Sequence, residues 1–291
     1  MSTYSIKDLE HLSGIKAHTI RIWEQRYNLL HPSRTDSNIR TYSDKDLKLL
    51  LNVALLNNNG FKISRIATMH IEEMLKEVAG LMENSSSGDE QIAGLTVAMI
   101  DMDQLKFEKV MASNILKRGF EETMINIIFP FLHRIGVLWL TGSIVPAQEH
   151  FISNLIRQKL IAAIDGQFNN VRPGTPKFVM FLPEGELHEI SLLFADYLIR
   201  SNGAQSIYLG QSVPLEDLVT VYKMHNPDYV FTVITSSVGN EDIGEFVNGL
   251  AKLLGDTKLM VTGYQVLESS VPFSQNVEVI RGFQEIKDFL V

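Results

Sequence analysis

The stretch KFVMFLPEGELHEIS, residues 177–191, decides the fold of the C-terminal part of the chain. Its apolar run reads as a buried strand that ends at Leu182, and a turn with proline and glycine leads into an amphipathic helix that begins near His188. This alternation predicts a Rossmann-like parallel sheet with helices on both faces over residues 177–291. The later strand-like runs lie at 206–209, 229–234, 258–262 and 277–280, and the later helices begin near Pro214, Glu241, Tyr264 and Phe283.

His188 falls in the first loop above the carboxyl edge of the predicted sheet, where the ligands of such sheets bind. A neutral imidazole is a good ligand for transition metals. Glu186, two residues earlier, is suited to accept the other ring N–H and to fix the tautomer. His188 is therefore a candidate metal ligand, and the alternative is a structural histidine near a helix start.

The residues before the sheet are helical. Between 91 and 167 the apolar residues recur at spacings of three and four, which predicts a four-helix bundle. Polar stretches at 84–90 and 169–176 read as linkers. We place the bundle domain at 73–168 and a separate N-terminal domain at 1–72.

The N-terminal domain has the layout of a winged helix-turn-helix. Ser5 is expected to cap a first helix that ends at Gly14, a second helix covers 17–27, and Ser43 with Asp46 opens a third. The second helix would enter the major groove, and the polar loop after it would form a wing that contacts phosphates. An ordinary three-helix domain with a solvated basic face is the alternative. The candidate DNA contacts are Lys16, Thr19, Arg21, Arg26, Arg34 and Arg40.

Charge separates this domain from the rest of the chain. Residues 1–70 hold ten Lys or Arg and six Asp or Glu, a net +4, and the remaining residues hold 16 basic and 28 acidic side chains, a net −12. A basic head on an acidic body predicts that only the head meets a polyanion. The chain has no cysteine, which excludes disulfides, thiolate metal sites and cysteine nucleophiles. It also has no apolar signal core and no run long enough to span a membrane, so we expect a cytoplasmic protein.

A third pattern is the Trp-x9-Glu-His spacing of Trp139, Glu149 and His150 in the stretch WLTGSIVPAQEH. These residues end one predicted helix and begin the next. A tryptophan at such a place can pack flat against an apolar ligand, and the glutamate and histidine offer polar contacts. A buried tryptophan beside a polar helix start is the alternative.

The string SGIKAHTIRIWEQRYNLLHPSRTDSNIRTYSDKDL resembles the winged-helix head of MerR-type regulators, with about 70 residues covered. Its Trp-Glu-x-Arg-Tyr form points to the members that carry cobalamin-binding domains. The resemblance implies that Trp23, Tyr27 and Tyr42 pack inside the head and do not contact bases.

EGELHEIS resembles the Asp-x-His-x-x-Gly signature of cobalamin-binding domains, which implies that His188 coordinates cobalt from below. The chain departs from the signature twice, with Glu186 in place of Asp and Ser191 in place of Gly. Tyr264 also replaces the second glycine of a Gly-Gly pair and is expected to crowd the nucleotide-tail pocket. Further positions that the resemblance assigns to the cofactor are Gly210, Ser236 and Gly263.

The Trp-x9-Glu-His spacing is similar to that of CarH-type light-sensing repressors, where the three side chains cover the upper face of adenosylcobalamin. In well-known members a histidine follows the tryptophan and takes the upper cobalt position after photolysis. This chain has Leu140 there, which cannot ligate, and His133 is a weak substitute.

The resemblance implies a non-enzymatic transcriptional regulator, expected to be a repressor, that binds double-stranded operator DNA as a dimer or tetramer. Adenosylcobalamin would stabilise the oligomer, and light would cleave the cobalt–carbon bond and loosen it. One alternative is a regulator that has lost the cofactor, as Ser191, Tyr264 and Leu140 suggest, and responds to a protein partner or another ligand. A remote alternative is a corrinoid carrier module of a methyltransferase, against which the DNA-reading head argues.

Overall fold

In a computed structural model, the chain divides into two compact units, residues 1–155 and 156–291. The structure describes residues 3–34, 38–84, 88–140, 144–167, 171–236 and 242–290, without the side chains of 79–80, 82–84 and 137–140. The predicted boundary between head and bundle falls inside the first unit. Helix α10 (Pro146–Asp165) continues from the first unit into the second.

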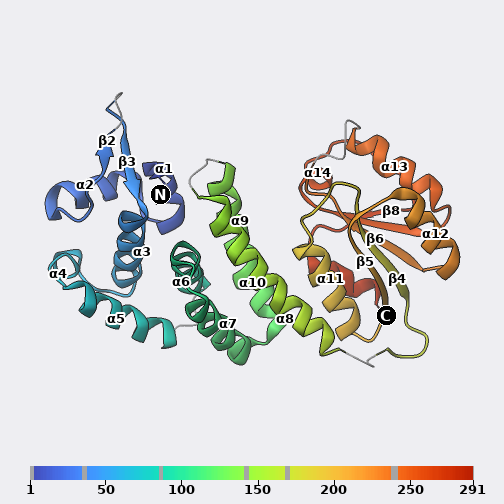
Figure 1. Cartoon of the computed structure of the whole chain (residues 1–291), viewed down its shortest axis with the longest axis horizontal. Coiled ribbons are helices and arrows are strands. Elements are labelled where there is room, and N and C mark those ends of the chain that lie inside the picture. Colours follow the sequence, from blue (N-terminus) through green and yellow to red (C-terminus); the bar gives the residue numbers. More distant parts are fainter. Residues whose placement is uncertain are drawn as a thin grey trace. The chain divides into compact units, whose positions relative to one another are not determined.

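The head is the predicted winged helix-turn-helix fold (Figure 1). The capping boxes of Ser5 with Asp8 and of Ser43 with Asp46 are both present, and Gly14 closes the first helix at a positive φ of 71°. Strands β2 and β3 pair antiparallel and form the wing. The elements of residues 3–66 are β1 (Thr3–Tyr4), α1 (Ile6–Ser13), α2 (Ala17–Tyr27), β2 (Ser33–Arg34), β3 (Arg40–Ser43), α3 (Asp44–Asn58) and α4 (Ile63–Ile66), and α5 (Ile71–Asn84) follows them.

The four-helix bundle is present, with one irregular member. A π-helical turn, Met124–Ile128, ends two residues before Pro130 and joins α8 to α9 into one helical segment. Proline has no N–H and clashes with the preceding turn, so the hydrogen-bond ladder widens there without ending. The bundle consists of α6 (Gly88–Asp101), α7 (Gln104–Arg118), the segment α8 (Phe120–Thr123) to α9 (Phe129–Leu140), and α10.

The predicted linker 84–90 is largely wrong. Asn84 ends α5, and Gly88 to Glu90 form the first turn of α6, so only residues 85–87 lie outside the described helices. Two polar contacts join α3 to α6: Asn59 Nδ2 donates to Glu90 Oε1 at 2.6 Å, and Lys48 pairs with Asp101. The composition of this stretch predicts a linker. The prediction fails because serine, glycine and acidic residues suit a helix N-terminus as well as a loop.

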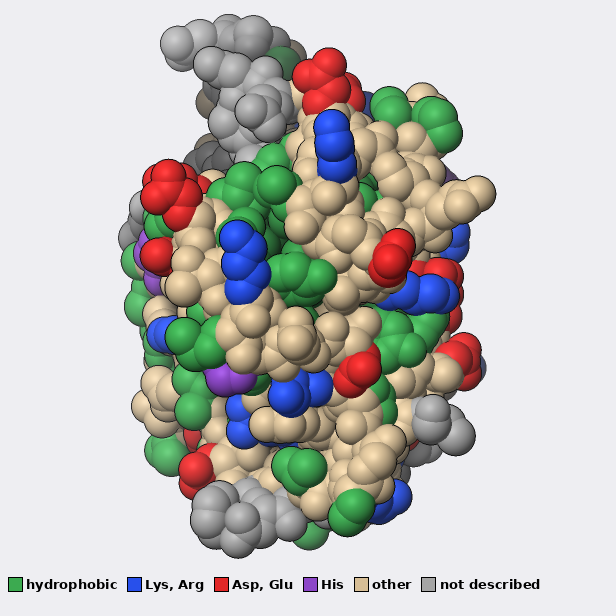
Figure 2. Space-filling view, turned by 90° about the vertical axis from the view of Figure 1, so that its right-hand side faces the viewer, with side chains coloured by type: hydrophobic (Ala, Val, Ile, Leu, Met, Phe, Trp, Pro, Cys, Tyr) green, Lys and Arg blue, Asp and Glu red, His purple; other side chains and the backbone are tan. Residues whose placement is uncertain are grey.

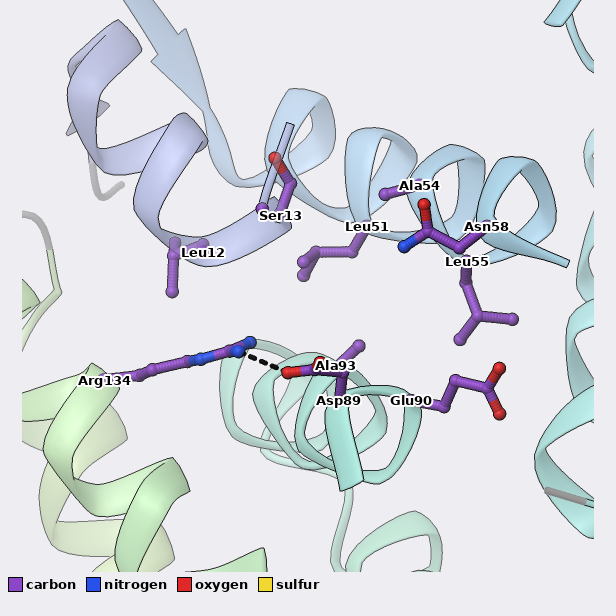
Figure 3. A pocket seen from close by; sticks show the side chains of 11 residues that line it. Leu12, Ser13, Leu51, Ala54, Leu55, Asn58, Asp89, Glu90, Ala93 and Arg134 are labelled. Atoms are coloured by element: carbon purple, nitrogen blue, oxygen red, sulfur yellow. Dashed lines mark hydrogen bonds and ion pairs between the residues drawn. The ribbon is translucent and has the colours of Figure 1, made fainter. Parts of the chain in front are cut away.

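A cavity of about 240 Å³ lies where α1 and α3 of the head meet α6 and α9 of the bundle (Figure 3). Leu12, Leu51 and Leu55 line it from the head. The ion pair between Asp89 and Arg134, at 2.5 Å, connects the two bundle helices beside it. The head therefore contacts the bundle through packed helices, hydrogen bonds and ion pairs.

The second unit is a parallel five-stranded sheet in the order β5-β4-β6-β7-β8, as the alternation predicted. Helices α12 and α13 cover one face, and α11 with the C-terminal 3-10 helix covers the other (Figure 1). The elements are β4 (Lys177–Pro183), α11 (Ile190–Ser201), β5 (Gln205–Val213), α12 (Leu215–His225), β6 (Tyr229–Val233), α13 (Ile243–Leu253), β7 (Lys258–Thr262), α14 (Tyr264–Leu267), β8 (Val277–Val279) and the 3-10 helix Phe283–Phe289.

The strand order places the functional loops. Strand β5 lies on one side of β4, and β6 lies on its other side. The side on which successive strands are added therefore changes at β4. Ligands of open parallel sheets bind at such a switch point, outside the carboxyl ends of the strands. The loops after β4 and β6 meet there. Among the described residues, no helix has the length and apolar character needed to cross a bilayer.

Candidate functional site

The loop after β4 carries His188, whose side chain is 64% exposed, and the buried Glu186, whose side chain is 2% exposed. Glu186 Oε1 lies 2.6 Å from His188 Nδ1 and accepts the backbone N–H groups of Leu187 and His188. Its Oε2 accepts the N–H groups of Thr235 and Ser236, at 2.8 and 2.7 Å, from the loop after β6. One carboxylate thus joins both loops at the switch point and orients the imidazole.

The electrostatics keep this carboxylate ionised. Burial acts to raise the pKa of Glu186, but hydrogen bonds from His188, Ser236 and Thr235 outweigh it and lower the pKa to about 2. An ionised carboxylate next to Nδ1 favours the tautomer with the proton on Nδ1. A ring held in this way would coordinate a metal through Nε2. Ser236 Oγ, 3.3 Å from Nδ1, is a second polar neighbour of the ring.

The donor set fits a corrinoid better than a bare metal ion. Among the described residues, no group of three or more His, Asp or Glu side chains is placed to hold an ion. Catalytic and structural metal sites usually take three or more protein ligands. A single exposed histidine with a carboxylate behind it suits a metal that brings its own equatorial ligands, as cobalt does in a corrin ring.

The other predicted cofactor positions surround the same sheet edge. Gly263 has a φ of 106°, and a Cβ there would lie 2.4 Å from the Ile234 carbonyl oxygen, so only glycine fits. Gly210 also has a positive φ and lies at a register shift between β4 and β5. Ser191 lies in the first turn of α11, and Tyr264 is 64% exposed at the start of α14.

Glu149 and His150 lie together in the first turn of α10. Glu149 Oε2 is 2.9 Å from His150 Nδ1, and the two side chains are 34% and 70% exposed. Trp139 and Leu140 lie near the end of α9, but their side chains are outside the described part of the chain. His133 is exposed on α9.

In the head, the six candidate DNA contacts divide into two groups. Arg21 and Arg26 are exposed along α2, and Lys16, its N-cap residue, is exposed and pairs with Glu10 at 3.1 Å. Arg34 lies in the wing, where Nη1 donates to Asn38 Oδ1 at 2.6 Å. Thr19 is half-exposed next to His18.

Arg40 differs from the exposed cations because it is half-buried, and its Nε donates to Glu24 Oε1 at 3.0 Å. Tyr42 donates to the other oxygen of Glu24, and burial, followed by Glu24, raises the pKa of Tyr42 to about 12. Trp23 and Tyr42 are buried, as the resemblance implied. Arg40 therefore also has a structural contact in the head.

Sequence reasoning missed several residues. Lys62 and Arg65, at the start of α4 and within it, are exposed cations of the head. Glu189, next to His188, is buried and contacts Arg157 and Tyr208. The sequence signal for Glu189 was its place directly after the predicted ligand His188. On the face of the molecule in Figure 2, positive and negative side chains are interspersed.

Two family models match separate parts of the chain. The model of the MerR HTH family regulatory protein matches residues 4–70, and that of the B12 binding domain matches residues 91–163. The HTH-type transcriptional repressor CarH of Myxococcus xanthus is 30% identical over 264 residues, which cover 87% of this chain and 85% of the relative. The repressor CarA of the same organism is 27% identical over 78% of this chain and 75% of its own.

Among solved structures, the monomethylamine corrinoid protein of Methanosarcina barkeri aligns with 75% of this chain and 97% of its own, at 15% identity and a TM-score of 0.44. The sequence comparisons extend over both units. The chain belongs to the CarH-type family of transcriptional regulators, in which a MerR-type DNA-binding head precedes a cobalamin-binding region.

Proposed function

We propose that this regulator is a cytoplasmic repressor whose assembly and DNA affinity are set by adenosylcobalamin, with His188 as the lower axial ligand of cobalt. The observation that carries the proposal is the Glu186–His188 pair at the switch point of the sheet. Its carboxylate is buried, ionised and bonded to both adjacent loops, so the ring orientation is set before any ligand arrives. Such pre-organisation is what a metal-ligating histidine needs.

The bundle would supply the upper face of the site. Glu149 is half-buried and His150 is exposed beside it, which suits polar contacts to the sugar of an adenosyl group. Trp139 would pack against its base, as the family spacing implies. Adenosylcobalamin, when bound, supplies a cobalt–carbon bond that light can break. Leu140 has no donor atom, so this chain would not offer a second histidine next to the tryptophan.

DNA control would follow from assembly. One head contributes few exposed cations, among them Arg21, Arg26 and Arg34. Linking several heads in a dimer or tetramer raises the apparent affinity for adjacent half-sites by a large factor without new contacts. A cofactor that stabilises the assembly would therefore act as a co-repressor.

The test is gel filtration of the purified chain mixed with adenosylcobalamin in the dark. We expect a coloured complex that elutes earlier than the cofactor-free protein and shifts back after green light. Retained colour with no light-dependent shift would leave a cobalamin sensor without photoreception. Absence of retained colour would contradict cofactor control.

A second candidate function is supported by two positions. Ser191 and Tyr264 add side chains where the family signature has glycine, and Tyr264 is exposed at the sheet edge. A chain in which they block the nucleotide tail would be a regulator that responds to a protein partner or another ligand. The double variant Ser191→Gly, Tyr264→Gly separates the two cases, because it would acquire cobalamin binding only if these side chains are the obstacle.

A further inference from the structure

The loop that carries His188 is held by two buried carboxylates, one on each side of the histidine. Glu186 orients the ring as described above. Glu189 is 6% exposed, and its carboxylate lies between two partners from other elements. Tyr208 of β5 donates to Oε2 at 3.2 Å, and Arg157 of α10 forms an ion pair with Oε1 through Nε.

The position of Glu189 is coupled to that of His188 through the backbone. The Glu189 N–H donates to the Leu187 carbonyl at 3.0 Å, which closes a tight turn around His188. The Glu189 carbonyl accepts the N–H of Leu193 at 2.8 Å and so starts α11. A shift of the Glu189 side chain would therefore move the Cα of His188, one residue away.

Arg157 brings α10 into this arrangement. Arg157 lies in the second unit, and its side chain is 47% exposed while its partner is nearly inaccessible. The same helix begins with Glu149 and His150, about two turns earlier. The residue pair thus connects the His188 loop to the part of α10 that lies in the second unit.

We infer that Arg157, acting through Glu189 together with Tyr208, is a positioning residue for the axial histidine. The inference rests on the proposed function, since it assigns Arg157 a role at the same cobalamin site. Without the guanidinium, Glu189 would be a buried carboxylate with Tyr208 as its remaining described partner, and a buried charge that loses its partner destabilises the segment that holds it. The turn around His188 would then lose one of its two anchors, and cobalt ligation would weaken.

The chain contains a matched control. Arg200 pairs with the buried Asp196 at 2.9 Å, and Ser206 of β5 adds a hydroxyl to that carboxylate. This cluster repeats the chemistry of Arg157, Glu189 and Tyr208, but Arg200 and Asp196 both lie within α11, and Asp196 is eight residues beyond His188. Loss of Arg200 should destabilise the second unit without moving the His188 loop.

The experiment compares wild type, Arg157→Met, Arg157→Lys and Arg200→Met in the dark. Thermal unfolding of the cofactor-free proteins measures stability, titration with adenosylcobalamin measures affinity, and the visible spectrum of the bound cofactor reports histidine ligation. We expect Arg157→Met to bind about tenfold more weakly or worse, with a spectrum shifted toward the form without axial histidine. Arg157→Lys should recover most of the affinity, and Arg200→Met should bind like wild type.

Equal affinity and an unchanged spectrum for Arg157→Met would overturn the inference, as would an equal loss in Arg200→Met. If Arg157→Met does not fold, Tyr208→Phe takes its place, because it removes the hydrogen bond from Tyr208 to Glu189. Binding weaker than that of Arg200→Met then supports the inference, and equal binding overturns it. A wild-type chain that retains no cobalamin would overturn the proposed function and this inference together.

Discussion

Replacing Glu186 with glutamine removes one acceptor from the centre of the site. The two carboxylate oxygens divide four backbone donors between them: Leu187 and His188 on Oε1, Thr235 and Ser236 on Oε2. A glutamine amide has one oxygen, so in either orientation its NH2 group faces two backbone N–H groups. A buried donor without an acceptor costs about 1–3 kcal/mol, which predicts a loss of about 2–6 kcal/mol from the second unit.

The assay must report on the second unit. Both tryptophans, Trp23 and Trp139, belong to the first unit, so tryptophan fluorescence would miss the effect. Hydrogen exchange of peptides from β4 and β6, measured across a urea series, gives the local unfolding free energy. Glu184→Gln is the matched control, because Glu184 is exposed in the same loop and should change stability by less than about 0.5 kcal/mol. The reasoning is refuted if the two variants differ by less than about 1 kcal/mol.

Three other predictions concern single side chains. Arg21→Met should lower DNA affinity and its salt dependence without changing the stability of the head. Arg40→Met should also destabilise the head, because Glu24 loses a partner. Fluorescence anisotropy measures the affinities and urea unfolding the stabilities, and equal unfolding midpoints for the two variants would contradict this division. Since the pKa of Tyr42 in the folded head is raised to about 12, its contribution to stability is complete below pH 10 and is lost between pH 10 and 12. Tyr42→Phe should remove this fall in the unfolding free energy, which amounts to up to about 3 kcal/mol, when unfolding is followed by tryptophan fluorescence across this pH range. Parallel curves of stability against pH for wild type and variant would contradict the assignment. Gly263→Ala should cost more than about 2 kcal/mol, because its Cβ would meet the Ile234 carbonyl, and a wild-type melting temperature would show that the turn can relax.

The sequence predicted the second unit well because its signals are local. Each buried strand is a short apolar run bounded by turn residues, and parallel strands need helical connections, so alternation alone fixes the layer structure. His188 and Glu186 were found for the same reason, since a strand end followed by a carboxylate and an imidazole is a local pattern.

The contacts between distant elements were not predictable in this way. Nothing near Glu189 in the sequence shows that Arg157, 32 positions earlier, faces it, or that Glu24 binds both Arg40 and Tyr42. The region 84–90 was assigned to a linker for a related reason. Its residues suit a loop and a helix N-terminus equally, and only the packing of α6 against α3 decides between them.

We propose that a nitrogen atom of His188 binds the cobalt of cobalamin. Electron paramagnetic resonance of the reduced, cobalt(II) form tests this claim most directly, because a nitrogen in the axial position splits each cobalt line. Protein grown on nitrogen-15 and loaded with unlabelled cofactor should convert the triplet splitting of an ordinary nitrogen into a doublet, and His188→Ala should abolish this protein-derived splitting. A triplet that persists in labelled protein would show that the cofactor's own base, and no side chain of this chain, occupies the axial position.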